Sequence, residues 1–437
     1  MRESAIYRNI NTQYFKAKLL SWAQNFSHIA YYDSNYSDNN FNKKSYQNYD
    51  CIVGVDKISE LIIGENDNFE KLKSYSNKVK DWIFGFLTYD LKNEIEDLKS
   101  KNSDNLNMPI MSFFQPKLLF FINKNIIKVE FDTDYTPRIL VNNLVKQIKC
   151  YVPNKINSTE VNLIQKVSKE KYIENINEIK KYINKGYIYE MNYCIEFYSE
   201  ETLINPVEKY LELNKLSSSP FSCFYKLYDR FLMSASPERF LMKKGVNIIS
   251  QPIKGTAKRG ITPEEDLKFK TQLANDSKEQ SENVMIVDLV RNDLSKTAET
   301  GSVEVEELFG IYTFPQLHQM ISTVKSKLRN DVNFFDAIKD CFPMGSMTGA
   351  PKIKSMELIE KFEETKRGLY SGAVGYVSPY YNFDFNVVIR SIQYNKSRKY
   401  VSFMVGSAIT SKSDPEKEYA ECLLKAAAMK QALYSNS

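Results

Sequence analysis

The chain of 437 residues is 43% hydrophobic and 13% aromatic, which is enough apolar side chain for a large core in one big or several ordinary domains. Basic and acidic residues are interspersed along it, so the net charge of +5 indicates a solvated surface and argues against nucleic-acid binding. No apolar run approaches the roughly 18 residues of a membrane-spanning helix, and the N-terminus lacks the apolar core of a signal peptide, so we expect a soluble, cytoplasmic protein that binds no membrane.

The metal-binding residue types narrow the possible cofactors. Six cysteines are scattered without a Cys-x-x-Cys pair, and we expect them to be reduced and buried. The chain has two histidines, His28 and His318, so a zinc site of the usual His/Cys type is not expected. Any metal would bind carboxylates, and ligation by oxygen alone favours magnesium.

The first part of the chain is predicted to contain both helices and strands. By itself it has no motif that indicates a reaction. Residues 82–90 are predicted to form a buried strand with Gly85 at a tight position. Residues 118–131 are predicted to form a hairpin, and a boundary is expected at 153–158. Helical periodicity resumes at 169–184.

The next part brings two candidate catalytic residues together. Strands are predicted at 186–197, 221–227 and 231–236, and a helix at 206–213. A hairpin follows and returns through 246–253. If Gly245 lies near the turn of this hairpin, Glu238 and Lys254 are close to opposite one another. Opposed Cβ atoms in such a pair lie about 4.5–5.5 Å apart.

A stripe of carboxylates follows Lys254. Asp276, Glu279 and Glu282 lie three residues apart on a predicted helix, so they share one face. A carboxylate stripe needs cations, and the neighbouring Lys254 indicates an anionic or electrophilic substrate.

A second stripe lies on the last predicted helix, which starts at Asp414-Pro415 with an N-cap acid and a proline in the first turn. Glu418, Glu421 and Lys425 share a face of this helix. Between the two helices we expect a strand at 321–326, a glycine loop at 342–352 that opens a helix through 362, and strands at 371–377, 385–392 and 400–409. The two stripes could clamp one magnesium ion that binds a substrate carboxylate, or they could be two solvated helix faces.

Each remaining candidate also has a structural explanation. Lys254 could be a nucleophile or general base if burial lowers its pKa, or a surface residue after a strand. Glu238 could be a general acid if burial raises its pKa, or a partner of Arg239 in an ion pair. His318 could belong to a site or be structural. The loop at 345–352 is similar to an anion cradle, but it lacks the Gly-Lys-Ser/Thr of a nucleotide-binding loop.

These motifs, in this order, resemble the chorismate-utilising enzymes, and most closely the aminodeoxychorismate synthase component I branch of that family. The resemblance is specific over residues 170–430 and weaker over 1–150, where Gly85 to Leu91 still fits. The segments that carry it are Ser-Pro-Glu-Arg-Phe at 236–240, Pro-Ile-Lys-Gly-Thr at 252–256, Glu-Asn-Val-Met-Ile-Val-Asp-Leu-Val-Arg-Asn-Asp at 282–293, Gly-Ser-Met-Thr-Gly-Ala-Pro-Lys at 345–352 and Glu-Tyr-Ala-Glu at 418–421.

The resemblance implies an α+β fold, a large sandwich of central antiparallel β-sheets with outer helices. An N-terminal region at 1–155 and a chorismate-binding catalytic region at 165–432 would pack as one globular unit. Glu282 and Glu421 would bind Mg²⁺ with support from Glu279 and Glu418, and Glu238 would protonate the departing ring hydroxyl. The residues implied to line the chorismate pocket are Gly255, Thr256, His318, Thr348, Tyr376, Arg390, Gly406 and Lys425, of which Arg390 suits a bidentate grip on a carboxylate.

Lys254 separates the branches of this family. Anthranilate synthases typically carry alanine at this position, whereas in the aminodeoxychorismate branch the lysine attacks the ring, expels the 4-hydroxyl and forms a covalent adduct. Ammonia then enters at the 4-position and displaces the lysine. Isochorismate-forming and salicylate-forming relatives place a lysine where this chain has Glu190, and the nearest relatives usually have glutamine there; Tyr187 stands where aspartate is common.

We therefore expect a magnesium-dependent enzyme that converts chorismate and ammonia to 4-amino-4-deoxychorismate for p-aminobenzoate and folate synthesis. The sequence shows no glutaminase triad, so ammonia would come from a separate glutamine amidotransferase subunit. The alternatives are an anthranilate synthase component I and a non-catalytic regulatory subunit that binds chorismate or tryptophan. Asp33, Ser34 and Pro220 are similar to the motifs of a tryptophan pocket in several members, which makes them a possible effector pocket.

Overall fold

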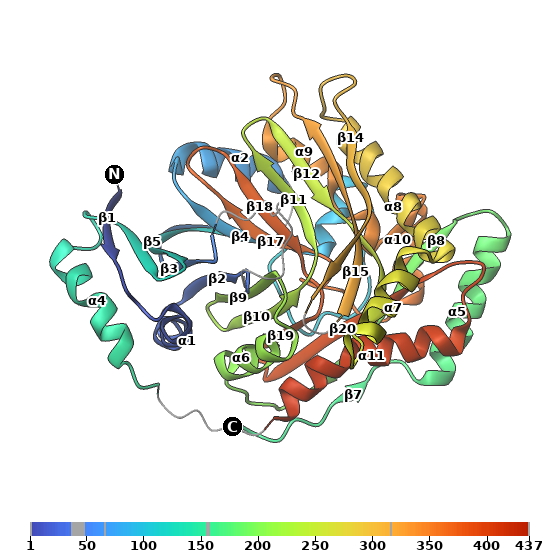
Figure 1. Ribbon diagram of the computed structural model, residues 1–437, viewed down its shortest axis with the longest axis horizontal. Coiled ribbons are helices and arrows are strands. Elements are labelled where there is room, and N and C mark those ends of the chain that lie inside the picture. Colours follow the sequence, from blue (N-terminus) through green and yellow to red (C-terminus); the bar gives the residue numbers. More distant parts are fainter. Residues whose placement is uncertain (1, 36–48, 65–66, 154–157, 315–316, 436–437) are drawn as a thin grey trace.

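Antiparallel β-strands form the centre of the molecule, and helices cover them (Figure 1). The computed structural model describes residues 2–35, 49–64, 67–153, 158–314 and 317–435. Its first elements are β1 (Arg2–Tyr7), α1 (Thr12–Ala23), β2 (His28–Asp33), β3 (Cys51–Ile63), α2 (Asn68–Val79), β4 (Ile83–Leu87), η1 (Tyr89–Leu91), α3 (Lys92–Ile95), β5 (Met111–Asn123), β6 (Ile126–Asp132) and α4 (Arg138–Cys150). The middle of the chain forms β7 (Ile164–Gln165), α5 (Lys169–Asn184), β8 (Glu190–Ser199), α6 (Pro206–Ser217), β9 (Phe221–Leu227), β10 (Arg230–Ser236), β11 (Arg239–Lys244), β12 (Asn247–Gln251), β13 (Ile253–Lys258), α7 (Pro263–Ala274) and α8 (Ser277–Ser295). The last elements are β14 (Glu304–Thr313), β15 (Leu317–Lys327), α9 (Phe334–Cys341), η2 (Gly345–Met347), β16 (Gly349–Ala350), α10 (Lys352–Phe362), β17 (Ala373–Val377), β18 (Phe383–Val387), β19 (Ser391–Asn395), β20 (Tyr400–Ile409) and α11 (Pro415–Tyr434).

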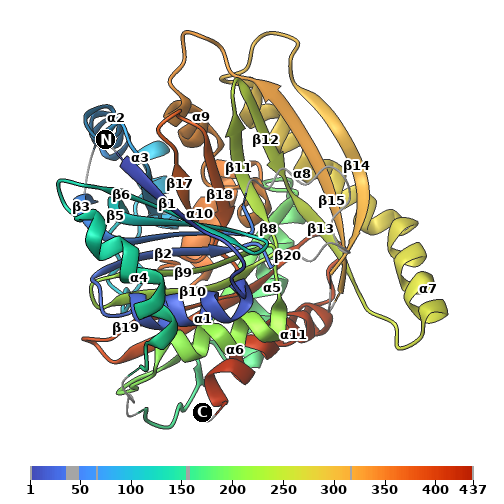
Figure 2. The same cartoon turned by 60° about the vertical axis from the view of Figure 1, so that its left-hand side comes forward.

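The strands form two runs that meet at the long strand β5. The first run leads from β5 through β3, β2, β9, β10, β19 and β20 to β8. The second leads from β5 through β4, β17, β18, β11 and β12 to β15, which also pairs with β13 and β14. Figure 2 shows both runs, with β13 and β15 next to α8 at one side of the molecule.

Apolar side chains fill three spaces around these runs. Phe84, Leu232 and Val374, from both runs, belong to one buried cluster between them. A second cluster joins the first run to α1, α4, α5, α6 and α11, and a third joins the second run to α2, α8 and α9. The helices thus lie outside two facing layers of strands, which confirms the predicted α+β sandwich.

Strands from both predicted regions pair directly. β2 pairs with β9, and β4 pairs with β17, so the sheet is continuous across the two regions. The division at 1–155 and 165–432 stays a prediction, and residues 154–157 of the expected boundary lie outside the described residues. Among the described helices, none is both long and apolar enough to cross a membrane.

Several predicted elements match the structure closely, and others differ in their bounds. The helix at 169–184 and the strands at 221–227 and 400–409 have the predicted bounds. A Cβ at Gly85 would lie 2.3 Å from the carbonyl oxygen of Ser112, which explains the glycine in β4. The single strand predicted at 385–392 is wrong: β18 ends at Val387 and β19 begins at Ser391, because Arg390 between them has a left-handed φ of 50°.

Candidate active site

Lys254 lies on β13 between β8 and α8. Its Nζ donates a hydrogen bond to Glu190 Oε1 at 2.9 Å and lies 3.8 Å from Glu282 Oε2. Burial lowers the pKa of Lys254, but the charges of Glu190 and Glu282 outweigh burial and raise the pKa above its ordinary value. The prediction that burial depresses this pKa therefore does not describe the site without substrate, in which the amine is held protonated.

The glycine after Lys254 lets α8 approach the strand. Gly255 has a left-handed φ of 101°, and a Cβ there would lie 3.2 Å from Glu279 Oε2. Thr256, the other predicted pocket residue on β13, is opposite Gln319 of β15. A glycine at 255 thus places the carboxylates of α8 beside the lysine.

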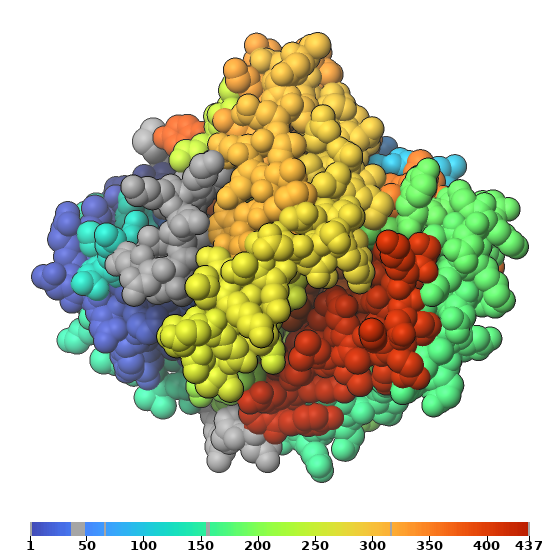
Figure 3. Space-filling model, turned by 45° about the vertical axis from the view of Figure 1, so that its right-hand side comes forward, coloured from blue at the N-terminus to red at the C-terminus, as the bar shows by residue number. Residues whose placement is uncertain are grey.

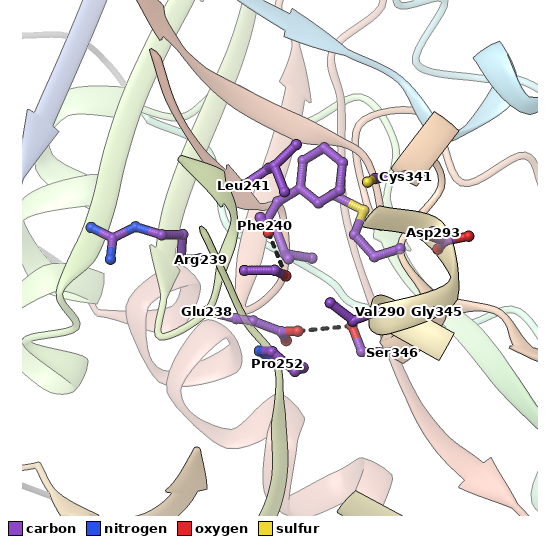
Figure 4. Close-up of a pocket in the computed structure, with 13 residues that line it drawn as sticks. Glu238, Arg239, Phe240, Leu241, Pro252, Val290, Asp293, Cys341, Gly345 and Ser346 are labelled. Carbon is purple, nitrogen blue, oxygen red and sulfur yellow. Dashed lines mark hydrogen bonds between the residues drawn. The ribbon is translucent and has the colours of Figure 1, made fainter. Parts of the chain in front are cut away.

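Glu238 lies between β10 and β11 and is 5% exposed. Ser346 Oγ donates a hydrogen bond to its Oε1 at 2.7 Å (Figure 4). Burial raises the pKa of Glu238 to about 7, against the opposing effects of the Ser346 hydrogen bond and the Lys254 charge. A carboxyl group with this pKa can donate a proton near neutral pH, as general acid catalysis requires.

The hairpin register differs from the one predicted. Arg239 is opposite Gln251, so Glu238 is next to Pro252 in the register and Lys254 lies two residues beyond it, on β13. A bulge between Arg239 and Met242 shifts the pairing. The charge of Lys254 still acts on Glu238, so the two groups belong to one site.

The acidic residues of α8 and α11 face a common space. Burial raises the pKa of Glu279, and the negative charge of Glu282 raises it further. Burial also raises the pKa of Glu282, and the negative charge of Glu418 of α11 contributes to this increase. Lys278 is near all four predicted carboxylates, because Glu282, Glu279, Glu418 and Glu421 all raise its pKa against burial. Figure 3 shows this face, where the yellow of α7 and α8 meets the red of α11 around a recess.

The first acid of the α8 stripe has another role. Asp276 is the N-cap of α8, and its Oδ1 accepts hydrogen bonds from the backbone N–H groups of Lys278 and Glu279. Asp276 thus starts the helix that presents Glu279 and Glu282.

The four carboxylates fit a hard divalent cation by their chemistry. They are oxygen donors only, and burial, together with repulsion from neighbouring carboxylates, raises the pKa of Glu279 and Glu282, a repulsion that a cation would relieve. Glu421 is paired with Lys425 at 2.6 Å, and Glu282 with Lys254 and Lys278. Within the part of the chain that the structure describes, no three His, Cys, Asp or Glu side chains are close enough to hold a metal ion.

Arg390 lies between β18 and β19 with a left-handed backbone. Burial lowers the pKa of its guanidinium, and the charge of Glu421 opposes this effect. Among the described residues, none forms a hydrogen bond or ion pair with its guanidinium. A half-buried arginine in this state suits a carboxylate ligand.

The remaining predicted pocket residues are tied to the framework. Lys425 Nζ donates to the carbonyl oxygen of Gly406 on β20 at 2.9 Å. Thr348 is fully buried, and its Oγ1 donates to the carbonyl oxygen of Met344 at 3.0 Å. His318, also fully buried, is held by Thr313 Oγ1 at 2.9 Å and by Asp266 Oδ1 of α7 at 3.0 Å.

The glycine loop is fastened to β8 by a buried ion pair. The Arg367 guanidinium is bound to Glu363 at 2.6 Å and donates to the carbonyl oxygens of Met347 at 2.7 Å and Asn192 at 3.1 Å. The backbone N–H of Asn192 donates to the carbonyl oxygen of Thr348 at 2.8 Å. These bonds place the loop beside Glu190 and Glu238.

Tyr376 is placed away from Lys254. It lines a cavity of about 460 Å³ together with Asp33, Ser34 and Pro220, the residues of the possible effector pocket. Asp384 also lines this cavity and accepts hydrogen bonds at 3.0 and 3.1 Å from Arg239. Tyr376 thus lies in the predicted effector pocket.

Sequence reasoning gave no role in the site to two residues that the structure brings there. Ser346 lay within the recognised Gly-Ser-Met-Thr motif without a role, although it contacts Glu238. Glu190 was noted as a departure from the usual glutamine, and it is the hydrogen-bond partner of Lys254. Glu190 lies on a predicted strand, and a buried acidic side chain needs a cationic partner. This pattern was the signal that could have indicated a lysine or arginine beside Glu190.

The fold is that of known chorismate-converting enzymes. Anthranilate synthase component I from Streptococcus pneumoniae TIGR4 matches with a TM-score of 0.77 and 24% identity, over 90% of this chain and 95% of that one. MenF, the menaquinone-specific isochorismate synthase from Escherichia coli, matches with a TM-score of 0.75 and 16% identity, over 100% of this chain and 95% of that one. The architecture is thus shared between enzymes of different activity.

The relatives found by sequence similarity include several proteins named as aminodeoxychorismate synthases. Aminodeoxychorismate synthase component 1 from Bacillus subtilis (strain 168) is 31% identical over 411 residues, 88% of this chain and 86% of that protein. The probable chloroplastic aminodeoxychorismate synthase of Oryza sativa subsp. japonica is 40% identical over 60% of this chain but 29% of its own length. Component 1 from Escherichia coli (strain K12) is 36% identical over 58% of this chain and 56% of its own length, so the chain spans only part of these last two relatives.

The profile of the chorismate-binding enzymes matches residues 28–431. The chain belongs to the chorismate-binding enzyme family, which confirms the resemblance seen in its motifs. A cytoplasmic location stays a prediction, because the plant relatives are described as chloroplastic.

Proposed function

We propose that this protein is component I of an aminodeoxychorismate synthase, which converts chorismate and ammonia to 4-amino-4-deoxychorismate and water. The observation that carries the proposal is Lys254, placed 2.9 Å from Glu190 and 3.8 Å from Glu282 in the same site as Glu238. The similarity to several aminodeoxychorismate synthases supports it.

The first step forms a bond from Lys254 Nζ to the ring and breaks the bond from the ring to the 4-hydroxyl. The amine must first lose a proton, and Glu190 is the nearest acceptor, because its Oε1 already accepts from Nζ and its buried Oε2 has no hydrogen-bond partner among the residues that the structure describes. Glu238 donates its proton to the departing hydroxyl, which leaves as water. A carboxyl with a pKa near 7 can do this at neutral pH.

The second step forms a bond from ammonia to the 4-position and breaks the bond to Lys254 Nζ. The proton lost by the bound ammonia can return to Glu238, which is a carboxylate after the first step, and the displaced amine recovers its proton from Glu190. Each residue is thus restored for the next turnover. Because the relatives are called component 1, we propose that a separate glutamine amidotransferase subunit supplies the ammonia.

Substrate binding and magnesium complete the proposal. We assign the grip on a chorismate carboxylate to Arg390, whose half-buried guanidinium has no hydrogen-bond or ion-pair partner among the described residues. We assign Mg²⁺ to Glu282 and Glu421, with Glu279 and Glu418 beside them; when bound, the ion would neutralise substrate carboxylate charge. Asp33, Ser34 and Pro220 stay assigned to a possible effector pocket.

Product identification by mass spectrometry tests this function. Purified protein is incubated with chorismate, Mg²⁺ and an ammonium salt. We expect a product that keeps the enolpyruvyl group and yields p-aminobenzoate when a lyase is added. Anthranilate with released pyruvate would assign the chain to the rival anthranilate synthase activity, and bound chorismate without turnover would assign it to a regulatory role.

Lys254→Ala tests the covalent step. Loss of a nucleophile should lower kcat for 4-amination by roughly a thousandfold or more, and intact-protein mass spectrometry should detect an adduct in the wild type only. Lys258→Ala is the matched control, because Lys258 is an exposed lysine on the same strand. Unchanged 4-amination by Lys254→Ala would refute the nucleophile role.

A further inference from the structure

A small cavity lies beside Glu238 and Ser346. Its volume is about 350 Å³, and its walls are mostly apolar, with Phe240, Leu241, Val290 and Met344 among them. In Figure 4 the carboxyl of Glu238 points toward Ser346. Ser346 Oγ donates to Glu238 Oε1 at 2.7 Å in this apolar setting, where a hydrogen bond to a carboxyl group has a larger effect than in water.

Ser346 is fixed from its other side. Its carbonyl oxygen accepts a hydrogen bond from Asn192 Nδ2 of β8 at 2.7 Å. The next carbonyl, that of Met347, accepts from the buried Arg367 at 2.7 Å. Ser346 is 9% exposed, so solvent does not compete strongly for its hydroxyl. The framework therefore fixes the backbone that carries the hydroxyl, and the hydroxyl itself bonds to Glu238.

Other charged groups near Glu238 are engaged elsewhere or act at longer range. Arg239 is paired with Asp384 at 3.0 Å, and Asp293, on the cavity wall, is paired with Lys352 and Lys296. Lys254 acts on Glu238 through its charge, and the backbone N–H of Ile253 donates a further hydrogen bond. Of the side chains that the structure describes, Ser346 is thus the one that contacts the Glu238 carboxyl by a direct hydrogen bond.

We infer that Ser346 is a positioning residue that keeps Oε1 of Glu238 as a hydrogen-bond acceptor, so that the transferable proton resides on Oε2. A hydroxyl that donates to Oε1 disfavours a proton on the same oxygen. The protonated carboxyl then presents one defined O–H toward the leaving group, and the bond also stabilises the carboxylate left after transfer. This role rests on the proposed function, in which Glu238 protonates the 4-hydroxyl.

The test is a titration of Glu238 in the protein without substrate. Infrared difference spectra against Glu238→Gln isolate its carboxyl band as a function of pH. Loss of a hydrogen bond to the charged form should raise the midpoint in Ser346→Ala by about one pH unit, because that bond holds the pKa of Glu238 below the value that burial alone would give. An unchanged or lowered midpoint would overturn the inference.

Two further variants sharpen this test. Ser346→Thr keeps the hydroxyl and should restore the midpoint. Ser250→Ala removes a hydroxyl from the wall of the same cavity, but Ser250 Oγ donates to the carbonyl oxygen of Phe240 at 2.8 Å, so the midpoint should stay near that of the wild type. A midpoint that rises equally in Ser250→Ala would show a general effect of the cavity and overturn the specific role of Ser346.

Kinetics separate this inference from the proposed function. In Ser346→Ala the alkaline limb of the kcat profile should move to higher pH, since a general acid is lost as pH rises through its pKa. The plateau of kcat should fall several-fold with little change in KM. If the wild type makes no 4-amino product while the titration behaves as expected, the proposed function fails and the positioning of Glu238 stands.

Discussion

Glu282 lies close to Lys254 and is also one of the acidic residues that α8 and α11 bring to a common space. Its Oε2 lies 3.8 Å from Lys254 Nζ, and its Oε1 lies 3.7 Å from Lys278 Nζ. The charges of two lysines therefore act on this carboxylate. A cation bound to Glu282 would be repelled by both lysines, so metal and lysine are coupled through one side chain.

Glu282→Gln should weaken activation by magnesium, because the amide carries no charge for the ion. We expect the magnesium concentration for half-maximal activity to rise by roughly tenfold or more. Asp288→Asn is the control on the same helix, since Asp288 pairs with Arg291 at 2.7 Å on an exposed face. Magnesium activation that is the same in Glu282→Gln and the wild type would remove Glu282 from the metal site.

Glu238 makes the folded protein less stable as pH rises. Its pKa is about 7 when folded against 4.5 for an ordinary glutamate, so between these values the native state holds more protons than the unfolded state. Stability from the neutral carboxyl is therefore fully present below the lower value and is lost as pH approaches the higher one. The total loss is roughly 3 kcal/mol from a shift of this size.

Glu238→Gln should remove this dependence. Relative to the wild type, its free energy of unfolding should increase between pH 5 and pH 8 by roughly 3 kcal/mol, measured by urea denaturation at each pH. The exposed Glu264 gives a control, since Glu264→Gln should show no such trend. Parallel curves for Glu238→Gln and the wild type would contradict the raised pKa.

At the scale of elements, the approach of β13 to α8 depends on one glycine. In Gly255→Ala, the added Cβ would stand on a left-handed backbone, 3.2 Å from Glu279 Oε2 and 3.3 Å from Leu273. We expect a loss of stability of about 1–3 kcal/mol and a larger drop in activity, because Glu279 must move. Gly186→Ala is matched, since Gly186 has a φ of 79° and no heavy atom within 4 Å of the added Cβ.

The comparison of these two alanine variants isolates the contact from the backbone strain. Thermal unfolding and magnesium-dependent activity are measured for both. If Gly186→Ala and Gly255→Ala are equally affected in stability and activity, the close approach of α8 has no importance of its own.

Elements with regular patterns were predictable from the sequence. The bounds of α5, β9 and β20 follow from periodicity, and the start of α11 follows from Asp414 as N-cap before Pro415. The split between β18 and β19 was not predictable, because a left-handed Arg390 breaks a strand whose alternation continues on both sides. The register of β11 and β12 depends on a bulge after Arg239 that leaves no clear signal.

The candidate site was predictable in its residue types more than in its electrostatics. Motifs led to Lys254, Glu238 and the acidic stripes, and the raised pKa of Glu238 agrees with the expectation from burial. The pKa of Lys254 moves in the opposite direction to the expected one, because Glu190, 64 residues away in the chain, supplies the nearest charge. Such long-range pairs are visible only once the strands are placed.

At the scale of the whole molecule, the N-terminal strands complete both layers. β9 pairs along its length with β2, and β17 pairs with β4, so residues before 155 cover strands of the region at 165–432. Removing them would expose two buried strand edges and part of the cluster that contains Phe84 and Leu232.

A chain that begins at residue 158 should therefore fail to fold as a stable monomer. We expect aggregation, or a monomer without a cooperative thermal transition, measured by size-exclusion chromatography and calorimetry. Adding the separate segment 1–153 should improve recovery, because it supplies the missing pairing partners. A soluble 158–437 fragment with a cooperative transition would show that the region at 165–432 is an independent domain.

Glu238 and Arg239 are consecutive, yet their side chains point in different directions (Figure 4). Glu238 contacts Ser346 in the same site as Lys254, and Arg239 binds Asp384 at the wall of the cavity that Tyr376 lines. Neighbouring side chains of an extended chain point to opposite sides, so a single-residue insertion or deletion before this pair would exchange their directions. It would place a guanidinium beside Ser346 and a carboxyl beside Asp384. The length of this short segment is therefore fixed by contacts on two sides at once, since one lost codon would break the hydrogen bonds to Ser346 and to Asp384 together.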